Sequence, residues 1–233
     1  MIDGKPVLVI VPARGGSKGI PLKNLAKVCG ETLIAHVGQF VRRLRFVDEA
    51  IVSTDHPEIA AEAVKHGLSV PFIRPRSLSG DLIGDFDVLY HALTETERLN
   101  DREYHIILML QPTCPMRTVR DVEQTVGKVV YAGNDSAWTV ERVNKKYHPL
   151  KQLRVGQEWR LDYYSAKGRE IVARQQLEPT HIRNGACYAF TRECLLLQQT
   201  IMGKRSAAVV TEPLVNIDTP EDLAEAERLM GSR

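Results

Sequence analysis

Residues 11–24, VPARGGSKGIPLKN, place glycines and fixed positive charges directly after an apolar run. A glycine-containing loop after a strand can turn several backbone N–H groups toward one anion, and nearby lysines and arginines add full charges. The segment therefore suits a polyphosphate. It is not a Walker A loop, because Ile20 and Pro21 stand where that motif has Gly-Lys, and it lacks the G-x-G-x-x-G spacing. A tight turn with solvated lysines is the alternative that the loop alone leaves open.

Such a loop needs elements that hold it, and the hydrophobic pattern indicates them. Apolar runs that suit buried strands alternate with stretches in which apolar residues recur at helical spacing, as Leu33, Val37 and Phe40 do. A final helix is expected to follow the capping residue Thr219 and to open with Pro220. We expect strands at 6–11, 49–53, 70–73 and 104–110, and helices over 33–44, from 57, over 86–99 and over 118–131.

Apolar strands that alternate with amphipathic helices predict an α/β fold, in which helices cover both faces of a mostly parallel sheet and make three layers. Ligands of such folds bind beyond the carboxyl ends of the strands. The segments that follow the expected strands are ARGGSKG, STDH, RPRSLSGD and QPTCPMR. We therefore expect these four segments to build the ligand site.

The alternation stops at about 141–183, where the chain is polar, is rich in Arg, Tyr and Gln, and shows no long helical stripe. We interpret this segment as an inserted arm that carries short strands and contacts a partner. The rest of the chain continues the α/β pattern on both sides of it. The expected organisation is a single domain over 1–233 with one protruding arm.

The charge balance argues against several classes of function. The 233 residues include 31 basic and 29 acidic side chains with no block of like charges, so the sequence supports neither nucleic-acid binding nor a membrane-surface role. The apolar run near the N-terminus is too short to span a bilayer. Cys29, Cys114, Cys187 and Cys194 lack the spacing of a zinc site, and we expect them to be free thiols of a cytoplasmic protein.

Several motifs follow one another along the chain: PARGGSKGIPLKN, VSTD, the RP of Arg74 and Pro75, LQPTCPMR, HPLK, RQQL, NGACY and NIDTPEDL. Together they resemble the signature of the CMP-sialic acid synthetases, the N-acylneuraminate cytidylyltransferase family, which includes legionaminic and pseudaminic acid cytidylyltransferases. The resemblance covers essentially the whole chain. It implies a Rossmann-like nucleotidyltransferase fold, a homodimer built by the arm, and Mg²⁺ as cofactor. In the implied reaction the anomeric hydroxyl of an acidic nine-carbon sugar attacks the α-phosphate of CTP, giving a CMP-sugar and pyrophosphate.

The resemblance assigns two groups of residues to CTP. Arg14, Lys18 and Lys23 would neutralise the triphosphate as catalytic groups, which fits a phosphoryl transfer that depends on positioning and charge neutralisation. The second group, which would orient the triphosphate or surround the base and ribose, contains Gly15, Asn24, Arg74, Ser79, Asp81 and Asp85. A solvated basic loop is the structural alternative for the first group, and an ordinary loop with a helix cap is the alternative for the second.

The implied sugar site combines Gln111 with Lys151, Arg174 and Gln175. Gln111 follows a buried strand, its amide can hydrogen-bond a polyhydroxylated sugar, and Pro112 stiffens its loop. Lys151 and Arg174 match basic residues that approach the acidic sugar in the family. The alternatives are a polar strand end for Gln111 and a basic arm surface for the other residues.

The implied metal site departs from the family's pattern. Asp218 would hold Mg²⁺ through a carboxylate oxygen. The sialic acid enzymes carry Asp-x-Asp here, whereas this chain has Asn216 two residues before Asp218, so a neutral carbonyl replaces one anionic ligand. Asp55 is a lesser candidate for the metal and is expected to cap the helix that begins near Pro57.

Asp85 is a second departure, since the sialic acid enzymes have a small residue at this position near the base. A carboxylate accepts a hydrogen bond from the amino group of cytosine, and it also suits the N–H edge of guanine. The choice of nucleotide therefore stays open. Two other functions stay open as well: a nucleotidylyltransferase that uses another base or a sugar 1-phosphate, and a non-catalytic nucleotide-binding regulatory protein.

Overall fold

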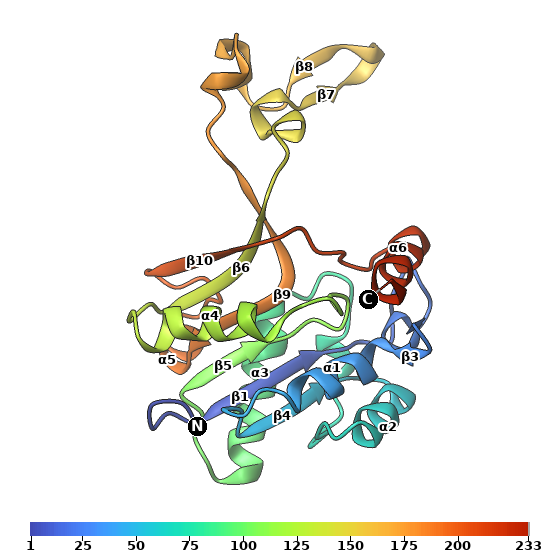
Figure 1. Ribbon diagram of the computed structural model, residues 1–233, viewed down its shortest axis with the longest axis vertical. Helices are drawn as coiled ribbons and strands as arrows, with labels where there is room; N and C mark the ends of the chain where they lie inside the picture. The colour runs from blue at the N-terminus through green and yellow to red at the C-terminus, as the bar shows by residue number, and fades with distance from the viewer. Residues whose placement is uncertain (233) are drawn as a thin grey trace.

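A six-stranded sheet forms the centre of the computed structural model, which describes residues 1–232 (Figure 1). The strand order is β10-β6-β9-β5-β1-β4. β9 pairs antiparallel with both of its neighbours, and the other strands run parallel. The expected mostly parallel α/β sheet is confirmed. The strands are β1 (Val7–Pro12), β4 (Glu49–Ser53), β5 (Ile106–Met109), β6 (Ser136–Arg142), β9 (His181–Thr191) and β10 (Ser206–Thr211).

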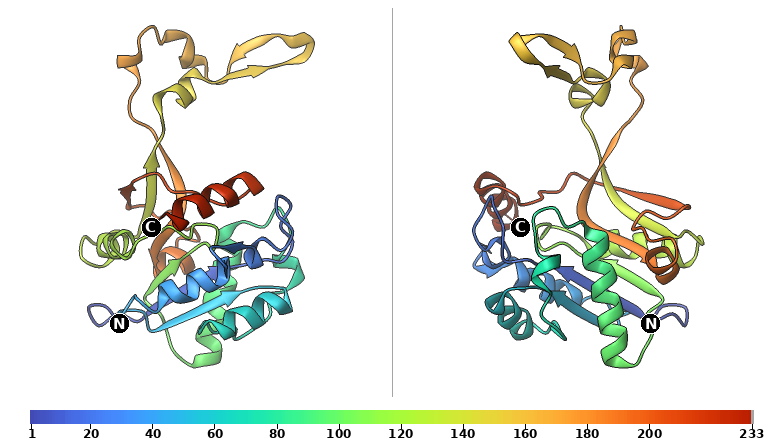
Figure 2. Two further views of the ribbon diagram at one scale, coloured as in Figure 1. Left: turned by 45° about the vertical axis from the view of Figure 1, so that its right-hand side comes forward. Right: turned by 180° about the vertical axis from the view of Figure 1, so that it is seen from behind.

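Helices cover both faces of the sheet, as the three-layer prediction requires. Val7, Val9 and Val11 of β1 pack in one core, whereas Leu8 and Ile10 pack in the other, because successive strand residues point to opposite faces. The first core is covered by α1 (Leu33–Val41), α2 (Pro57–Lys65) and α4 (Val119–Val130), and the second by α3 (Asp85–Asn100) and α5 (Arg192–Leu196). The view from behind in Figure 2 shows α3 in front of the sheet.

A third, small core holds the C-terminal helix against the rest of the molecule. α6 (Pro220–Gly231) packs through Ala226 on Val28 and Leu33, near the short hairpin of β2 (Lys27–Val28) and β3 (Glu31–Thr32). The expected start of this helix is confirmed, since the Thr219 side chain accepts a hydrogen bond from Asp222 N and Pro220 is the first helical residue.

The expected strand at 70–73 is wrong. Ser69 forms an isolated bridge with Ile51, and the chain then continues without a strand. Pro71 lies within this stretch and Pro75 follows it, and a proline has no N–H to donate to a neighbouring strand. The other expected strands and helices form close to their predicted positions, whereas the hydrophobic pattern does not predict β6, β9 or β10 of the central sheet.

Residues between β6 and β9 leave the sheet and project as an arm (Figure 1). The expected short strands are present as a hairpin of β7 (Leu153–Val155) and β8 (Leu161–Tyr163). His148 ties the two sides of the arm together, because its Nε2 donates to the carbonyl oxygen of Glu178 at 3.1 Å. The other ring nitrogen, Nδ1, accepts from Leu150 N at 3.1 Å, which leaves the ring proton on Nε2. The outer part of the arm is uncovered, with Trp159 89% exposed.

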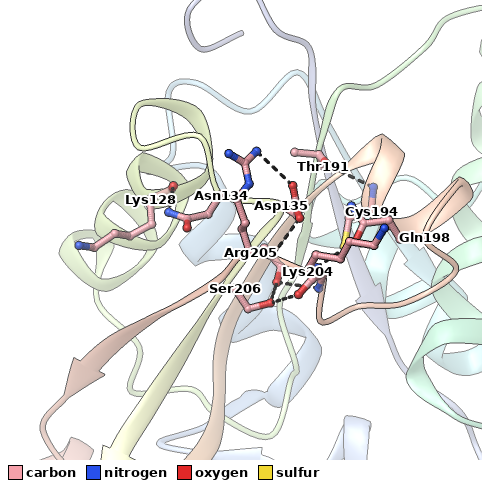
Figure 3. A network of polar contacts seen from close by, with 11 residues as sticks. Lys128, Asn134, Asp135, Thr191, Cys194, Gln198, Lys204, Arg205 and Ser206 are labelled. Carbon is pink, nitrogen blue, oxygen red and sulfur yellow. Dashed lines mark hydrogen bonds and ion pairs between the residues drawn. The ribbon is translucent and has the colours of Figure 1, made fainter.

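A polar network joins the N-terminal ends of β10 and β6 (Figure 3). The Asp135 carboxylate accepts from Arg205 N at 2.9 Å, and the Ser136 and Ser206 hydroxyl groups lie 2.7 Å apart. β10 is an edge strand, so these contacts help to fix its register against β6. The chain that leaves the other end of β10 leads to Asn216.

Within the described residues, no helix combines the length and apolar character that crossing a membrane requires. The cysteines are free, as expected: Cys29 is exposed, and Cys114, Cys187 and Cys194 are buried.

Candidate active site

A cavity of about 580 Å³ lies beyond the carboxyl ends of β1 and β5, where a parallel sheet places its ligands. Three of the four expected segments line its wall: the loop after β1, the segment after residues 70–73, where the predicted strand does not form, and the loop after β5. The wall therefore combines residues that are far apart in the sequence. The predicted site residues that line it are Arg14, Lys18, Lys23, Asn24, Arg74, Asp81, Asp85, Gln111, Asn216 and Asp218.

Asp81 gathers two of the predicted phosphate-binding side chains. Its Oδ1 accepts from Arg14 Nη1 at 2.7 Å, and its Oδ2 lies 2.7 Å from Lys18 Nζ. Hydrogen bonds from Lys18 and Arg14 hold the pKa of Asp81 below its ordinary value. A phosphate offers the same anionic oxygens as this carboxylate, so the two cations are already placed for a shared anionic partner.

Lys23 and Asp218 meet on another side of the cavity. Lys23 Nζ lies 2.7 Å from Asp218 Oδ1, and the lysine side chain is only 15% exposed. The basic loop also contacts this aspartate through its backbone, because a Cβ at Gly19 would overlap the carbonyl oxygen of Asp218. Asn24 fixes the loop from within by donating to the carbonyl oxygen of Arg14 at 3.0 Å. The loop is thus held at several points rather than solvated freely.

Arg74 is a buried cation with unused hydrogen-bond donors. It is 4% exposed, and its Nε and Nη2 have no hydrogen-bond partner in the part of the chain that the structure describes. Its Nη2 is 4.0 Å from Asp55 Oδ1, and burial lowers the pKa of Arg74. Buried donors without acceptors cost free energy, so a ligand oxygen that reached Arg74 from the cavity would be stabilised strongly.

The helix cap expected at Asp55 is wrong. His56 is the N-cap of α2, and the Asp55 carboxylate instead accepts from Gly15 N at 2.9 Å. This bond engages the N–H of Gly15, which does not line the cavity. Ser79 is also outside the cavity wall, and its hydroxyl donates to the carbonyl oxygen of Pro75 at 3.1 Å. Gly15 and Ser79 therefore support their loops rather than face the ligand space.

Gln111 is held by Arg117, a residue that the sequence analysis did not single out although it belongs to the motif LQPTCPMR. Arg117 is 4% exposed, its Nη2 donates to the carbonyl oxygen of Gln111, and its guanidinium lies 5.7 Å from the centre of the Phe40 ring. Burial lowers the pKa of Arg117. The loop after β5 is therefore fixed from inside the core, and the Gln111 side chain faces the cavity.

β9 closes the side of the cavity next to Gln111. Gly185 has φ +73° there, and a Cβ at this position would overlap Gln111 Oε1, so the geometry requires glycine. Tyr188 accepts from Gly185 N at 3.0 Å, and burial raises the pKa of Tyr188 to about 12, which keeps its hydroxyl protonated. Nearby, Asn216 Oδ1 is buried without a partner among residues 1–232.

Asp85 lies in the cavity wall but is engaged by a residue that the sequence analysis missed. Arg183 Nη1 is 3.4 Å from Asp85 Oδ2, and both residues line the cavity. The available signal was an arginine directly before the NGACY motif. Asp85 therefore pairs with a cation of its own chain, and its contact with a base stays a prediction.

Lys151, Arg174 and Gln175 do not reach this cavity within one chain. Lys151 and Arg174 line a separate cavity of about 240 Å³ in the arm, and Gln175 lies in the short 3₁₀ turn Arg174–Gln176. The structure thus brings together Gln111, the predicted metal positions and the predicted nucleotide positions other than Gly15 and Ser79, and leaves the basic sugar-binding positions on the arm.

Comparison with known proteins agrees with this geometry. Residues 8–233 match the family model described as cytidylyltransferase. The chain belongs to this family. It is 27% identical to the CMP-N,N'-diacetyllegionaminic acid synthase of Legionella pneumophila, with 96% of each chain covered. It is 29% identical to a pseudaminic acid cytidylyltransferase of Campylobacter jejuni, with 95% of each chain covered.

A solved structure shares the fold of this cytidylyltransferase. A CMP:2-keto-3-deoxy-manno-octonic acid synthetase complexed with CTP superimposes with a TM-score of 0.72 at 22% identity, covering 97% of this chain and 99% of that chain. The predicted fold class and the predicted resemblance are both confirmed.

Proposed function

We propose that this cytidylyltransferase transfers CMP from CTP to the anomeric hydroxyl of an acidic nine-carbon sugar and releases pyrophosphate. The observation that carries the proposal is the division of the cavity. Arg14, Lys18 and Lys23 come from the basic loop, whereas the Gln111 amide lies beside Gly185 of β9. The legionaminic and pseudaminic acid activities in the names of two relatives support such a sugar.

The proposed chemistry needs positioning and charge rather than a covalent intermediate. The sugar hydroxyl gives up its proton to solvent and attacks the α-phosphorus in line, the bond from this phosphorus to the bridging oxygen breaks, and pyrophosphate carries the electron pair away. Arg14 and Lys18 would exchange Asp81 for phosphate oxygens, and Lys23 would offset the charge that develops on the leaving group. Arg74 would supply its unused N–H donors to the nucleotide.

Mg²⁺ is the proposed cofactor, and the donor atoms fit it. Asp218 offers a carboxylate, and the buried Asn216 Oδ1 has no partner within the described residues. Mg²⁺ binds through one or two carboxylates together with phosphates and water. Bound there, the ion would neutralise phosphate charge, and Lys23 would turn from Asp218 to the triphosphate.

We also propose a homodimer in which the arm of one chain completes the sugar site of the other. Lys151 and Arg174 lie on the arm, apart from the cavity of their own chain. The arm also exposes large apolar side chains, among them Trp159 and Val172, which suit burial against a second copy. The cytoplasmic location stays a prediction that rests on the free cysteines.

A pyrophosphate-release assay tests the proposal. CTP, GTP and UTP are each paired with N-acylneuraminic, legionaminic and pseudaminic acids and with sugar 1-phosphates, at millimolar Mg²⁺. We expect release with CTP and at least one acidic sugar. Release only with GTP or UTP, or only with sugar 1-phosphates, would replace the proposal by the corresponding alternative. No release with any pair would favour a nucleotide-binding regulatory protein.

A further inference from the structure

Arg183 is a cavity cation that stands apart from the others. Arg14, Lys18 and Lys23 come from the loop after β1, whereas Arg183 comes from the first part of β9. Its strand neighbours Gly185 and Tyr188 line the same wall. Within the described residues, Arg183 is the one Lys or Arg that β9 contributes to the cavity.

An irregularity in the pairing of β9 aims Arg183 at the cavity. Trp138 of β6 pairs with Tyr188, but Val140 pairs with Arg183, so residues 184–187 lie opposite Thr139 alone. Bulges of this kind re-aim side chains beside active sites. The buried Asn184 side chain donates to Thr211 Oγ1 at 2.8 Å and occupies the interior, while Arg183 lines the cavity.

One carboxylate holds the Arg183 guanidinium at one nitrogen. Nη1 lies 3.4 Å from Oδ2 of Asp85, the first residue of α3, which is 98 positions away in the sequence. Among residues 1–232, Asp85 provides the one carboxylate oxygen within 4.0 Å of this guanidinium. A guanidinium carries five N–H donors in a planar arrangement, so the edge formed by Nε and Nη2 is available to a ligand.

We propose that Arg183 binds the carboxylate of the acidic sugar through its Nε and Nη2 edge, and that Asp85 is a positioning residue that fixes the guanidinium. The inference rests on the proposed function, since it takes the second substrate to be an acidic sugar. A planar guanidinium edge matches a carboxylate with two parallel hydrogen bonds. The contact would come from the same chain as the cavity, in addition to any contact from a partner's arm.

The pairing with Asp85 also makes the site favour a singly charged carboxylate over a dianionic phosphate. Arg183 and Asp85 together carry no net charge, so a dianionic phosphate brought to the same edge would meet the repulsion of Asp85 with little compensation. A singly charged carboxylate forms two charge-assisted hydrogen bonds and meets less repulsion. The pair therefore favours an acidic sugar over a sugar 1-phosphate.

The first test separates the Michaelis constants of the two substrates. Arg183→Gln removes the charge, and we expect the KM of the acidic sugar to rise about ten- to a hundredfold, the loss expected for a charge-assisted hydrogen bond, while the KM of CTP changes less than about twofold. Arg98→Gln is the matched control, because Arg98 is exposed and pairs with Glu95 outside the cavity. A rise in the KM of CTP rather than of the sugar would overturn the proposal.

The second test addresses the carboxylate itself. Inhibition constants are measured for the sugar acid and for its methyl ester, which lacks the negative charge, on wild type and on Arg183→Gln. Wild type should prefer the acid, and the variant should show a smaller preference, because any contact from a partner's arm would remain. An unchanged preference would show that the carboxylate binds elsewhere.

The third test concerns Asp85 as a positioning residue. Asp85→Ala should raise the sugar KM in wild type and add no further increase in the Arg183→Gln background, because its effect runs through the guanidinium. Independent, additive increases would contradict the positioning role. Failure of the proposed function can be told apart from failure of this inference. If the proposed function is wrong, the wild-type enzyme turns over no acidic sugar. If only this inference is wrong, the wild-type enzyme turns over an acidic sugar and Arg183→Gln leaves the KM of that sugar unchanged.

Discussion

The cavity and the arm solve different problems with similar residues. In the cavity, basic side chains meet carboxylates of their own chain: Lys23 pairs with Asp218 and Arg14 pairs with Asp81, both at 2.7 Å. On the arm, Lys151 and Arg174 surround a smaller hollow, and Trp159 is 89% exposed. The cavity is assembled by one chain. On the arm, Arg154 and Arg169 also pair with a carboxylate of their own chain, that of Asp162, whereas Lys151 and Arg174 have no carboxylate partner within the described residues.

The difference teaches where preorganisation comes from. The cavity residues follow buried strands, and contacts between distant segments fix them, as Arg117 fixes Gln111 from the core. The arm is joined to the sheet through β6 and β9, and its hairpin has little apolar burial of its own. Contacts such as that of His148 with Glu178 hold the two sides of the arm together, but the hairpin stays exposed, and a surface outside the chain that buried it would fix it further. This is the physical argument for the proposed homodimer.

The largest expected effect on turnover comes from a substitution in the cavity. Asp218→Asn removes the carboxylate of the proposed Mg²⁺ site, and we expect it to nearly abolish turnover at ordinary Mg²⁺ concentrations. Asn216→Asp should act in the opposite direction and tighten Mg²⁺ binding by adding a second charge. The measurement is pyrophosphate release as a function of Mg²⁺ concentration. Equal, small effects from both substitutions would mean that the metal binds elsewhere.

Lys23→Ala should lower kcat by roughly a hundredfold or more, since it removes a fixed positive charge that would offset the negative charge developing on the leaving pyrophosphate. Lys65→Ala is the control, because Lys65 is an exposed lysine of α2 outside the cavity. Single-turnover kinetics with saturating CTP measures the chemical step. Turnover within a few-fold of wild type would remove Lys23 from the catalytic set.

Arg174→Ala tests whether the arm acts on a second subunit. We expect the sugar KM to rise about ten- to a hundredfold with little change for CTP, because a charge-assisted pair with the carboxylate is lost. Mixing this variant with Lys23→Ala should restore part of the activity, since one of the two sites in a mixed dimer would receive both intact residues. Mixed dimers no more active than their parents would rule out a shared site, as would a monomer in solution.

The parts that the sequence predicted are those whose cause is local. β1, β4 and β5 follow from short apolar runs, and the basic loop follows from glycines and cations in one stretch. The pair of Asp85 and Arg183 joins residues 98 positions apart, so no local pattern announces it. Residues 70–73 show the converse, since the apolar run alone predicts a strand, but Pro71 within it has no N–H to donate and no strand forms.

Thr219→Ala should have a smaller effect, about 1 kcal/mol off the free energy of unfolding, because it removes the N-cap of α6. The same cap carries Asp222, which accepts from Asp218 N at 3.0 Å, so we also expect Mg²⁺ affinity to fall a few-fold. Thr118→Ala is the matched control, since it removes the equivalent cap of α4. It should lower stability to a similar extent and leave Mg²⁺ affinity unchanged; a parallel loss of Mg²⁺ affinity would mean that the cap does not place Asp218.

Trp159→Ser should have the smallest effect on folding, because it changes a side chain that has almost nothing to lose within its own chain. With 89% of its surface exposed, this tryptophan buries little area, so the unfolding free energy of the isolated chain should stay within about 0.5 kcal/mol of wild type. If the arm packs on a second copy, the same substitution should weaken the dimer, and sedimentation at decreasing protein concentration should show dissociation earlier than in wild type. Phe190→Ser is the contrasting change, since Phe190 is fully buried in the sheet core and its truncation should cost about 3 kcal/mol or more of stability. An unchanged dimer in Trp159→Ser would place the subunit contact away from the hairpin tip, and the arm would then act on the partner only through residues nearer its base.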